Sequence, residues 1–340
     1  MQQIQTNDTT LISNLDDNTG QISPMEKIKV VYIGGVGRSG STLIDLLAGQ
    51  ADGFFSVGEI IWIWQRNFQE NQLVASGEPF LESPFWHKVI EEAFGSFGAV
   101  NPVKIEALRK DVERVRHVMR IWMHEKGMRQ LNPEYHAKLR EYQAYTAKLY
   151  RAIQKVSGCD YILDSSKHPT HAFVLQTMDE IDLYTLHLIR DSRAVAHSWQ
   201  RKKLRPEVHW KTEYMPQFSI GWSIKDWYSG NVLMSLMSSI SEHYDRLRYE
   251  DFVKDPETGL NKIWSLIDRP NHTIDELKER YQNSANEDFS LSGNPIRFDQ
   301  KREIKIRLDK EWREKMPTGQ KLTVTAATLP LLIRYGYSPW

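Results

Sequence analysis

The stretch that decides the fold runs from residue 28 to residue 48 and reads IKVVYIGGVGRSGSTLIDLLA. Residues 28–33 form a largely apolar run that predicts a buried strand, and residues 43–48 place apolar side chains at helical spacing. The turn between them is rich in glycine, which lets the backbone approach an anion. The helix that follows presents free N–H groups and the positive end of its dipole. A strand, a glycine-rich turn and a helix in this order predict a phosphate-binding loop.

The residues of this loop set it apart from the usual nucleotide-binding loop. Residues 35–42 fit G-x-x-x-x-G-x-[ST], in which a nucleotide triphosphatase has a lysine before the final hydroxyl residue. Here Ser41 takes that place, and the cation of the loop is Arg38. The loop therefore suits an anion that is not bound as ATP usually is. A tight strand–helix turn without a ligand is the alternative, but such a turn needs neither the arginine nor two hydroxyl residues.

Composition limits the class of protein and its compartment. The 340 residues suffice for one large domain, alone or with an insertion. Lysine plus arginine and aspartate plus glutamate both number 44, and the formal net charge of zero argues against a general nucleic-acid binder. Cys159 is the only cysteine, so we predict no disulfide framework and no metal site, as in a reducing compartment. Without an apolar run of roughly 18 residues or a signal-peptide pattern, we expect a cytoplasmic protein without a membrane partner.

The pattern along the chain predicts one domain with a helical insertion. Residues 1–26 are rich in polar side chains and predict a disordered N-terminal tail, and residues 27–340 a single domain. Two long amphipathic helical patterns cover residues 102–126 and 133–156, each with proline at or near its first turn. They belong to a helical insertion at about residues 70–157, which we expect to cover the mouth of the site and to contact the substrate.

Further strands are predicted after this insertion. Apolar runs at residues 161–163, 183–189 and 244–249 alternate with helical patterns such as 192–203 and 256–267. This alternation indicates βαβ units. The predicted fold class is α/β, with a P-loop-like core, a mostly parallel central sheet flanked by helices, and a helical insertion on the acceptor side. In such sheets ligands bind beyond the carboxyl ends of the strands.

Polar residues stand at four of these strand ends. They are Arg38 in the first loop, Lys167 in the segment DSSK, Arg190, and Tyr249. Ser198 follows Arg190 by about two helical turns, so a guanidinium and a hydroxyl can converge on a second anion. A nucleotide with phosphates at both its 5′ and 3′ positions would bridge the two anion sites. Taken alone, Arg190 fits an ordinary ion pair as well.

These motifs together resemble those of the sulfotransferases that use 3′-phosphoadenosine 5′-phosphosulfate (PAPS). Residues 37–43, GRSGSTL, resemble the loop that binds the 5′-phosphosulfate. Residues 190–198, RDSRAVAHS, are similar to the 3′-phosphate motif, and residues 248–252, RYEDF, to the segment near the adenine. DSSK at 164–167 and GNPIRF at 293–298 resemble the bacterial branch of the family in particular. No motif of the family covers the helical insertion.

The resemblance implies a co-substrate and a reaction. The donor would be PAPS and the product PAP, and a sulfuryl group would pass in line, without a metal, to a hydroxyl or amine of a small-molecule or carbohydrate acceptor. The residues implied to bind the co-substrate are Gly37, Arg38, Ser39, Gly40, Ser41, Thr42, Arg190, Ser198, Tyr249 and Arg297. The last of these is expected to close over the nucleotide.

The resemblance also implies catalytic residues. Arg38 would supply electrostatic stabilisation, Lys167 would stabilise the leaving oxygen or the sulfuryl group, and Glu59 is the candidate base. Three histidines are alternatives for the base: His168, His171 and His197.

Two other functions stay open at this stage. A P-loop small-molecule kinase would need a loop lysine and a metal-binding acidic residue after a strand, for which Asp164 is available. A non-catalytic nucleotide-binding module would keep the loop and Arg190 but would need neither Lys167 nor Glu59. The acceptor, the choice between O- and N-sulfation and the oligomeric state are open as well.

Overall fold

The computed structural model of the chain describes residues 26–267, 269, 272–284, 288–291, 294–299, 301 and 303–339. The disordered tail predicted for residues 1–26 lies outside the described residues, apart from its last residue.

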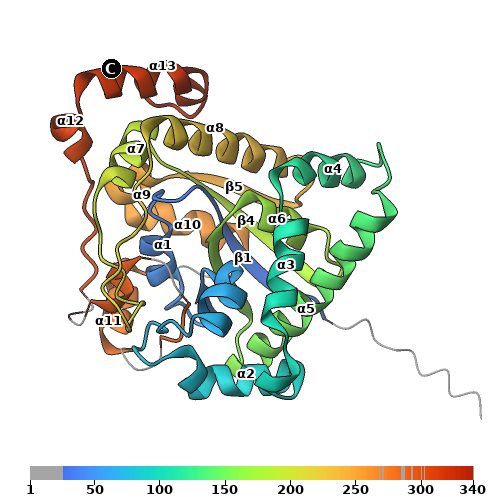
Figure 1. Ribbon diagram of the computed structural model, residues 1–340. Coiled ribbons are helices and arrows are strands. Elements are labelled where there is room, and N and C mark those ends of the chain that lie inside the picture. The colour runs from blue at the N-terminus through green and yellow to red at the C-terminus, as the bar shows by residue number, and fades with distance from the viewer. Residues whose placement is uncertain are drawn as a thin grey trace, which may run out of the picture.

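The core of the protein is a five-stranded sheet in the order β2-β3-β1-β4-β5 (Figure 1). All four neighbouring pairs of strands are parallel. The strands are β1 (Ile28–Gly35), β2 (Phe54–Gly58), β3 (Tyr161–Lys167), β4 (Ile181–Ile189) and β5 (His243–Arg248). The α/β class with a parallel central sheet is therefore confirmed. The central strands form from near-continuous apolar runs because both faces of a parallel sheet are covered.

Helices cover the two faces of the sheet, and the alternating side chains of β1 separate the two cores. Val30 and Tyr32 pack in one apolar cluster with residues of α5 (Pro133–Ser157), α6 (Pro169–Gln176) and α8 (Ile220–Met237). Val31 and Ile33 pack in the other, with residues of α1 (Ser41–Ala48), α9 (Tyr249–Lys254), α10 (Pro256–Leu266) and α11 (Ile274–Asn283). Successive side chains of a strand point to opposite faces, so β1 is buried on both.

The region between β2 and β3 is mainly helical, and its helices gather on one side of the sheet (Figure 1). They are α2 (Pro84–Phe94), α3 (Pro102–Val112), α4 (Val115–Glu125) and α5. The prediction of one helix over residues 102–126 was wrong, because the chain breaks between α3 and α4. The side chain of Glu113 at this break is buried in an ion pair with Arg109 and a 2.6 Å contact with His171.

The remaining α-helices are α7 (Ser192–Gln200), α12 (Glu311–Lys315) and α13 (Thr318–Arg334). Helix α7 packs against α8, and α12 and α13 pack against α7. A 3₁₀ turn at Ile60–Trp62 and a π-helical turn at Ile63–Gln69 follow β2. No helix within the described ranges is both long and apolar enough to cross a bilayer.

Candidate active site

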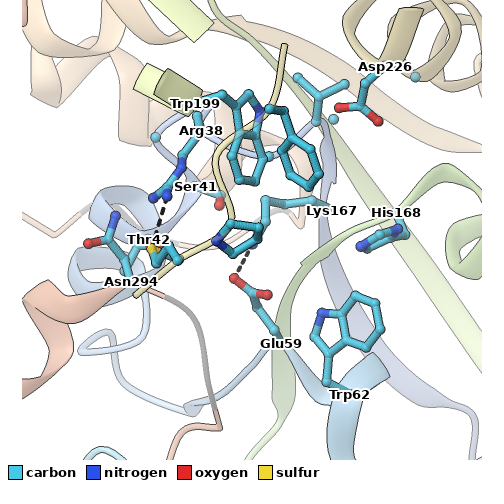
Figure 2. Close-up of a pocket in the computed structure, with 18 of the residues that line it drawn as sticks. Arg38, Ser41, Thr42, Glu59, Trp62, Lys167, His168, Trp199, Asp226 and Asn294 are labelled. Atoms are coloured by element: carbon cyan, nitrogen blue, oxygen red, sulfur yellow. Dashed lines mark hydrogen bonds and ion pairs between the residues drawn. The ribbon is translucent and has the colours of Figure 1, made fainter. Parts of the chain in front are cut away.

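A cavity of about 430 Å³ opens where β1, β2 and β3 end (Figure 2). Each of these neighbouring strands brings one charged residue to the cavity at or just after its carboxyl end: Arg38, Glu59 and Lys167. The three predicted catalytic residues thus line one cavity, because parallel strands end at the same edge of the sheet.

The loop after β1 is shaped by two close approaches to aromatic rings. A Cβ on Gly37 would lie 2.4 Å from the indole of Trp199, and a Cβ on Gly40 would lie 2.3 Å from the ring of Tyr249. Gly40 also has a φ of 96°, in the left-handed region that favours glycine. The loop glycines therefore let two rings press against the backbone just before α1 begins at Ser41.

Arg38 is a cation without a carboxylate partner. Its guanidinium stacks on Trp199 at 4.6 Å, and its Nη2 contacts the sulfur of Met215 at 2.9 Å. Within the described part of the chain no carboxylate lies at ion-pair distance from it, and its Nε is buried without a hydrogen-bond partner. Burial lowers the pKa of Arg38, the charge of Glu59 opposes this in part, and the neighbouring Arg201 and Arg190 lower it further. The loop thus holds a positive charge that no carboxylate in the described part of the chain contacts directly.

Glu59 and Lys167 form an ion pair across the cavity floor (Figure 2). Nζ of Lys167 lies 2.5 Å from Oε1 of Glu59 and donates to the carbonyl of Ser165 at 3.0 Å. Burial alone would raise the pKa of Glu59, but Lys167 and Arg66 outweigh it and lower the pKa to about 2. Glu59 is therefore ionised at every physiological pH, and its contact with Lys167 fixes the lysine amine.

Two of the charged residues at the cavity have strained backbones. Arg38 has a φ of 68° and Lys167 a φ of 72°, both in the left-handed region. For a residue with a side chain this conformation costs about 1–2 kcal/mol. Such strain is concentrated at functional sites, where surrounding contacts maintain it.

Of the three histidines predicted as alternative bases, His168 alone lines this cavity. Its ring lies edge-on to Trp62 with centroids 5.3 Å apart. Burial and the charge of Lys167 lower the pKa of His168 to about 4, so its imidazole is neutral near pH 7. The ring of His171 lies away from the cavity, buried against Glu113.

The second predicted anion site lies beside the first. Nη1 of Arg190 donates to the carbonyl of Arg38 at 2.9 Å, and the guanidinium covers the ring of Tyr249 at 4.7 Å. Its Nη2 lies 3.4 Å from a carboxylate oxygen of Asp309. Ser198 is buried on α7, the helix that follows Arg190. The guanidinium of Arg190 therefore joins the glycine-rich loop to the ring of Tyr249.

Arg297 is placed differently from the prediction. Its guanidinium is buried in an ion pair with Asp45 of α1 and donates to Ser290 Oγ at 2.7 Å. Instead of Arg297, Asn294 from the same segment lines the cavity. Arg297 therefore anchors this segment to α1 and does not point its charge into the cavity.

Asp164, the metal-binding candidate of the kinase alternative, is also engaged elsewhere. It is fully buried, accepts a hydrogen bond from Tyr150 at 2.7 Å, and accepts another from the backbone N–H of Ser166 at 2.8 Å. It does not line the cavity.

The other end of the cavity has lining residues that sequence reasoning missed. They come from the segment before α8 and from α8 itself: Met215, Phe218, Trp222 and Asp226. The rings of Phe218 and Trp222 stack with centroids 3.7 Å apart, and Trp199 meets Phe218 edge-on at 4.9 Å. The spacing of Trp222 and Asp226, four residues apart on one helix face, is the only signal in the sequence.

A family model shows the family of this chain, and two solved structures share its fold. The model of the family described as "Sulfotransferase family" matches residues 31–273, which is more than half of the chain. The sulfotransferase domain of the olefin synthase from Synechococcus PCC 7002 has a similar structure, with a TM-score of 0.52 at 17% identity over 94% of this chain and 98% of that one. The sulfotransferase domain from the curacin biosynthetic pathway has a TM-score of 0.50 at 17% identity, over 93% and 99% of the two chains. None of the curated proteins matches the sequence.

Proposed function

This chain belongs to the sulfotransferase family, and from that membership we propose that it moves a sulfuryl group from PAPS to a hydroxyl of a small-molecule or carbohydrate acceptor. The observation that carries the proposal is the contact between the two anion sites, in which Arg190 donates to the carbonyl of Arg38. A nucleotide with separate 5′ and 3′ phosphates is the ligand that uses two adjoining cationic sites at once.

The residues present fit such a nucleotide. Three buried donors at the two sites, Arg38 Nε, Ser39 Oγ and Arg190 Nε, have no hydrogen-bond partner among the described residues. A buried donor left without a partner costs about 1–3 kcal/mol, so an anion rich in acceptor oxygens would stabilise all three. The residues that would hold the 5′-phosphosulfate are Gly37, Arg38, Ser39, Gly40, Ser41 and Thr42, and those that would hold the 3′-phosphate and adenosine are Arg190, Ser198 and Tyr249.

Sulfuryl transfer requires groups that stabilise the developing negative charge and a base that accepts the proton of the acceptor. As the acceptor oxygen forms its bond to sulfur, the bond between sulfur and the bridging phosphate oxygen breaks, and negative charge moves onto that oxygen. Lys167, whose amine Glu59 holds in place, supplies positive charge at the cavity floor. Arg38 adds electrostatic stabilisation only, since an arginine is a poor proton donor.

Two of the residues predicted as the base line the cavity, Glu59 and His168. Glu59 has a pKa of about 2 and is paired with Lys167, which makes it a weak base. His168 is neutral, and the negative charge of a bound donor would raise its pKa toward neutrality. We therefore expect His168→Gln to reduce kcat by about 100-fold or more with unchanged PAP affinity, as for loss of a general base. The same result from Glu59→Gln alone would assign the base to Glu59.

Calorimetric titration tests the donor. Wild type, Arg190→Ala and the exposed control Arg246→Ala are each titrated with PAP, and separately with ATP and Mg²⁺. We expect PAP to bind without metal and its affinity to fall by about tenfold or more in Arg190→Ala only, as for loss of a hydrogen-bonded charge. A preference for ATP with Mg²⁺, or equal affinities in the three proteins, would refute the proposal and favour the kinase.

A transfer assay separates the enzyme from a binding module. Lys167→Ala should still bind PAP, though more weakly because the leaving oxygen is part of PAP, and should lose transfer of labelled sulfate from PAPS to acceptor mixtures. A wild-type protein that binds PAP but transfers no label to any acceptor class would favour the non-catalytic module.

A further inference from the structure

Among the described residues that line the cavity, all but two of the charged side chains pair with one another. Lys167 and Arg66 both face Glu59, at 2.5 and 3.9 Å. Arg205 lies 2.8 Å from Glu207, the second lining carboxylate. What remains is one cation, Arg38, and one carboxylate, Asp226.

Under the proposed function, the unpaired cation Arg38 binds the anionic donor. The proposed donor supplies no binding partner for the carboxylate of Asp226. Its carboxylate has no ion pair and no hydrogen bond to any residue that the structure describes, although it is half-buried. Burial raises the pKa of Asp226 to about 6, with no neighbouring charge to oppose it. A carboxylate held this way is best compensated by a positive charge brought in by a ligand.

The surroundings of Asp226 suit an organic cation. On the same face of α8, one turn earlier, Trp222 stacks with Phe218, and Trp199 lies 5.7 Å from Trp222. The faces of aromatic rings attract ammonium groups, and tryptophan does so best. In the view of Figure 2, the indole of Trp199 lies between Arg38 and Asp226.

We propose that the acceptor of this enzyme carries a positively charged amine remote from the hydroxyl that is sulfated, and that Asp226 with the aromatic wall of Trp199, Phe218 and Trp222 binds that amine. The inference rests on the proposed sulfotransferase function and names the substrate class of the same cavity. The cavity then holds an anionic donor at its loop end and a cationic acceptor at its α8 end, each facing the charge that the protein leaves unpaired.

A series of three phenols of nearly equal shape tests this assignment. Tyramine carries an ammonium, 4-ethylphenol is neutral, and 3-(4-hydroxyphenyl)propanoate carries a carboxylate. Each is titrated by calorimetry into the full chain saturated with PAP. We expect tyramine to bind about tenfold more tightly than 4-ethylphenol, as for a partly buried ion pair with a cation–π contact, and the propanoate to bind most weakly. Equal affinities, or no binding of tyramine, would overturn the inference.

Variants show whether Asp226 is responsible. Asp226→Asn should remove most of the preference for tyramine, leaving only the part that the aromatic rings contribute, and should not change the affinity for 4-ethylphenol. Asp226→Glu should keep more of the preference. The exposed Asp179→Asn serves as the matched control and should behave as wild type. A preference for tyramine that is undiminished in Asp226→Asn would refute the role of this residue.

The first titration of each series, with PAP alone, tests the proposed function separately from the acceptor assignment. A wild-type protein that fails to bind PAP contradicts the proposed function itself. PAP binding without any preference among the phenols contradicts only the acceptor assignment. PAP affinity also reports whether each variant is folded.

Discussion

The substitution Gly40→Ala tests the glycine-rich loop after β1 most clearly. It has two destabilising effects, backbone strain and a steric clash, and the structure allows them to be separated. Gly40 has a φ of 96°, and an added methyl would lie 2.3 and 2.4 Å from two carbons of the Tyr249 ring. Gly95 has a similar φ of 83°, with nothing within 4 Å of the place of an added methyl. A left-handed alanine costs about 1–2 kcal/mol at either position. Overpacking against a ring adds about 1–3 kcal/mol at Gly40 only.

We therefore expect Gly95→Ala to destabilise the protein by about 1–2 kcal/mol and Gly40→Ala by about 2–5 kcal/mol. The ring of Tyr249 has little room to move, because Arg190 covers it at 4.7 Å and is itself bonded to the loop. Displacing the ring should also displace Arg190, so Gly40→Ala should weaken PAP binding while Gly95→Ala leaves it intact.

Urea unfolding at 25 °C, with PAP titrations on the same proteins, measures both effects. In a Tyr249→Ala background the additional cost of Gly40→Ala should disappear, which a double-mutant cycle detects. If the two glycine substitutions cost the same in wild type, or if the excess persists without the ring, the described packing of Tyr249 on the loop is wrong.

Three further predictions concern buried charges. The pKa of the Glu59 carboxyl is about 2 in the folded protein, below its ordinary value of 4.5. The ionised carboxylate therefore stabilises the fold fully above pH 4.5, and this stabilisation is lost as the pH falls toward 2. Urea unfolding should show wild type losing more stability than Glu59→Gln between about pH 5 and 3, and equal losses would count against the ion pair. Burial alone would lower the pKa of His171, but the neighbouring carboxylates outweigh it and raise the pKa. The protonated imidazole therefore stabilises the fold fully below its ordinary pKa of 6.5, and this stabilisation is lost as the pH rises through the pKa of the folded protein. The stability gap between wild type and His171→Gln should thus narrow in alkaline buffer, and a gap independent of pH would contradict this. Arg297→Met leaves the buried carboxylate of Asp45 uncompensated and should cost about 3–5 kcal/mol, whereas Arg280→Met on the surface should cost under about 1 kcal/mol. Similar losses for the two would show that the buried pair is unimportant.

Much of the fold could be predicted from the sequence because its signals are local. The apolar run at residues 28–33 and those at 161–163 and 183–189 lie within β1, β3 and β4. The meeting of Arg38 with Lys167 at one cavity follows from a general property of parallel sheets, which does not require knowledge of the side-chain packing. Edge strand β2 was not predicted, since it has five residues and three of them are only partly buried.

Other features depend on contacts between distant residues. The partner of Arg297 is Asp45, 252 residues earlier in the chain, and no local pattern distinguishes a buried ion pair from a guanidinium that binds a nucleotide. At the helix break, Glu113 contacts His171 of α6, which also lies far along the chain. Asp226 was missed because a helical pattern does not reveal which face of α8 turns toward the cavity.

The left-handed backbones of Arg38 and Lys167 have a consequence for how this protein could change under selection. Glycine adopts such a conformation without strain, and replacing either residue by glycine would also remove a charge from the cavity. Variants selected only for folded yield or heat resistance should therefore drift toward glycine at position 38, and in doing so they would lose a group proposed to carry out transfer. At position 167 the contact between Lys167 and Glu59 opposes such a drift. Directed evolution of a more stable form of this protein therefore has to select for catalytic activity in every round, because selection for stability alone would enrich inactive variants.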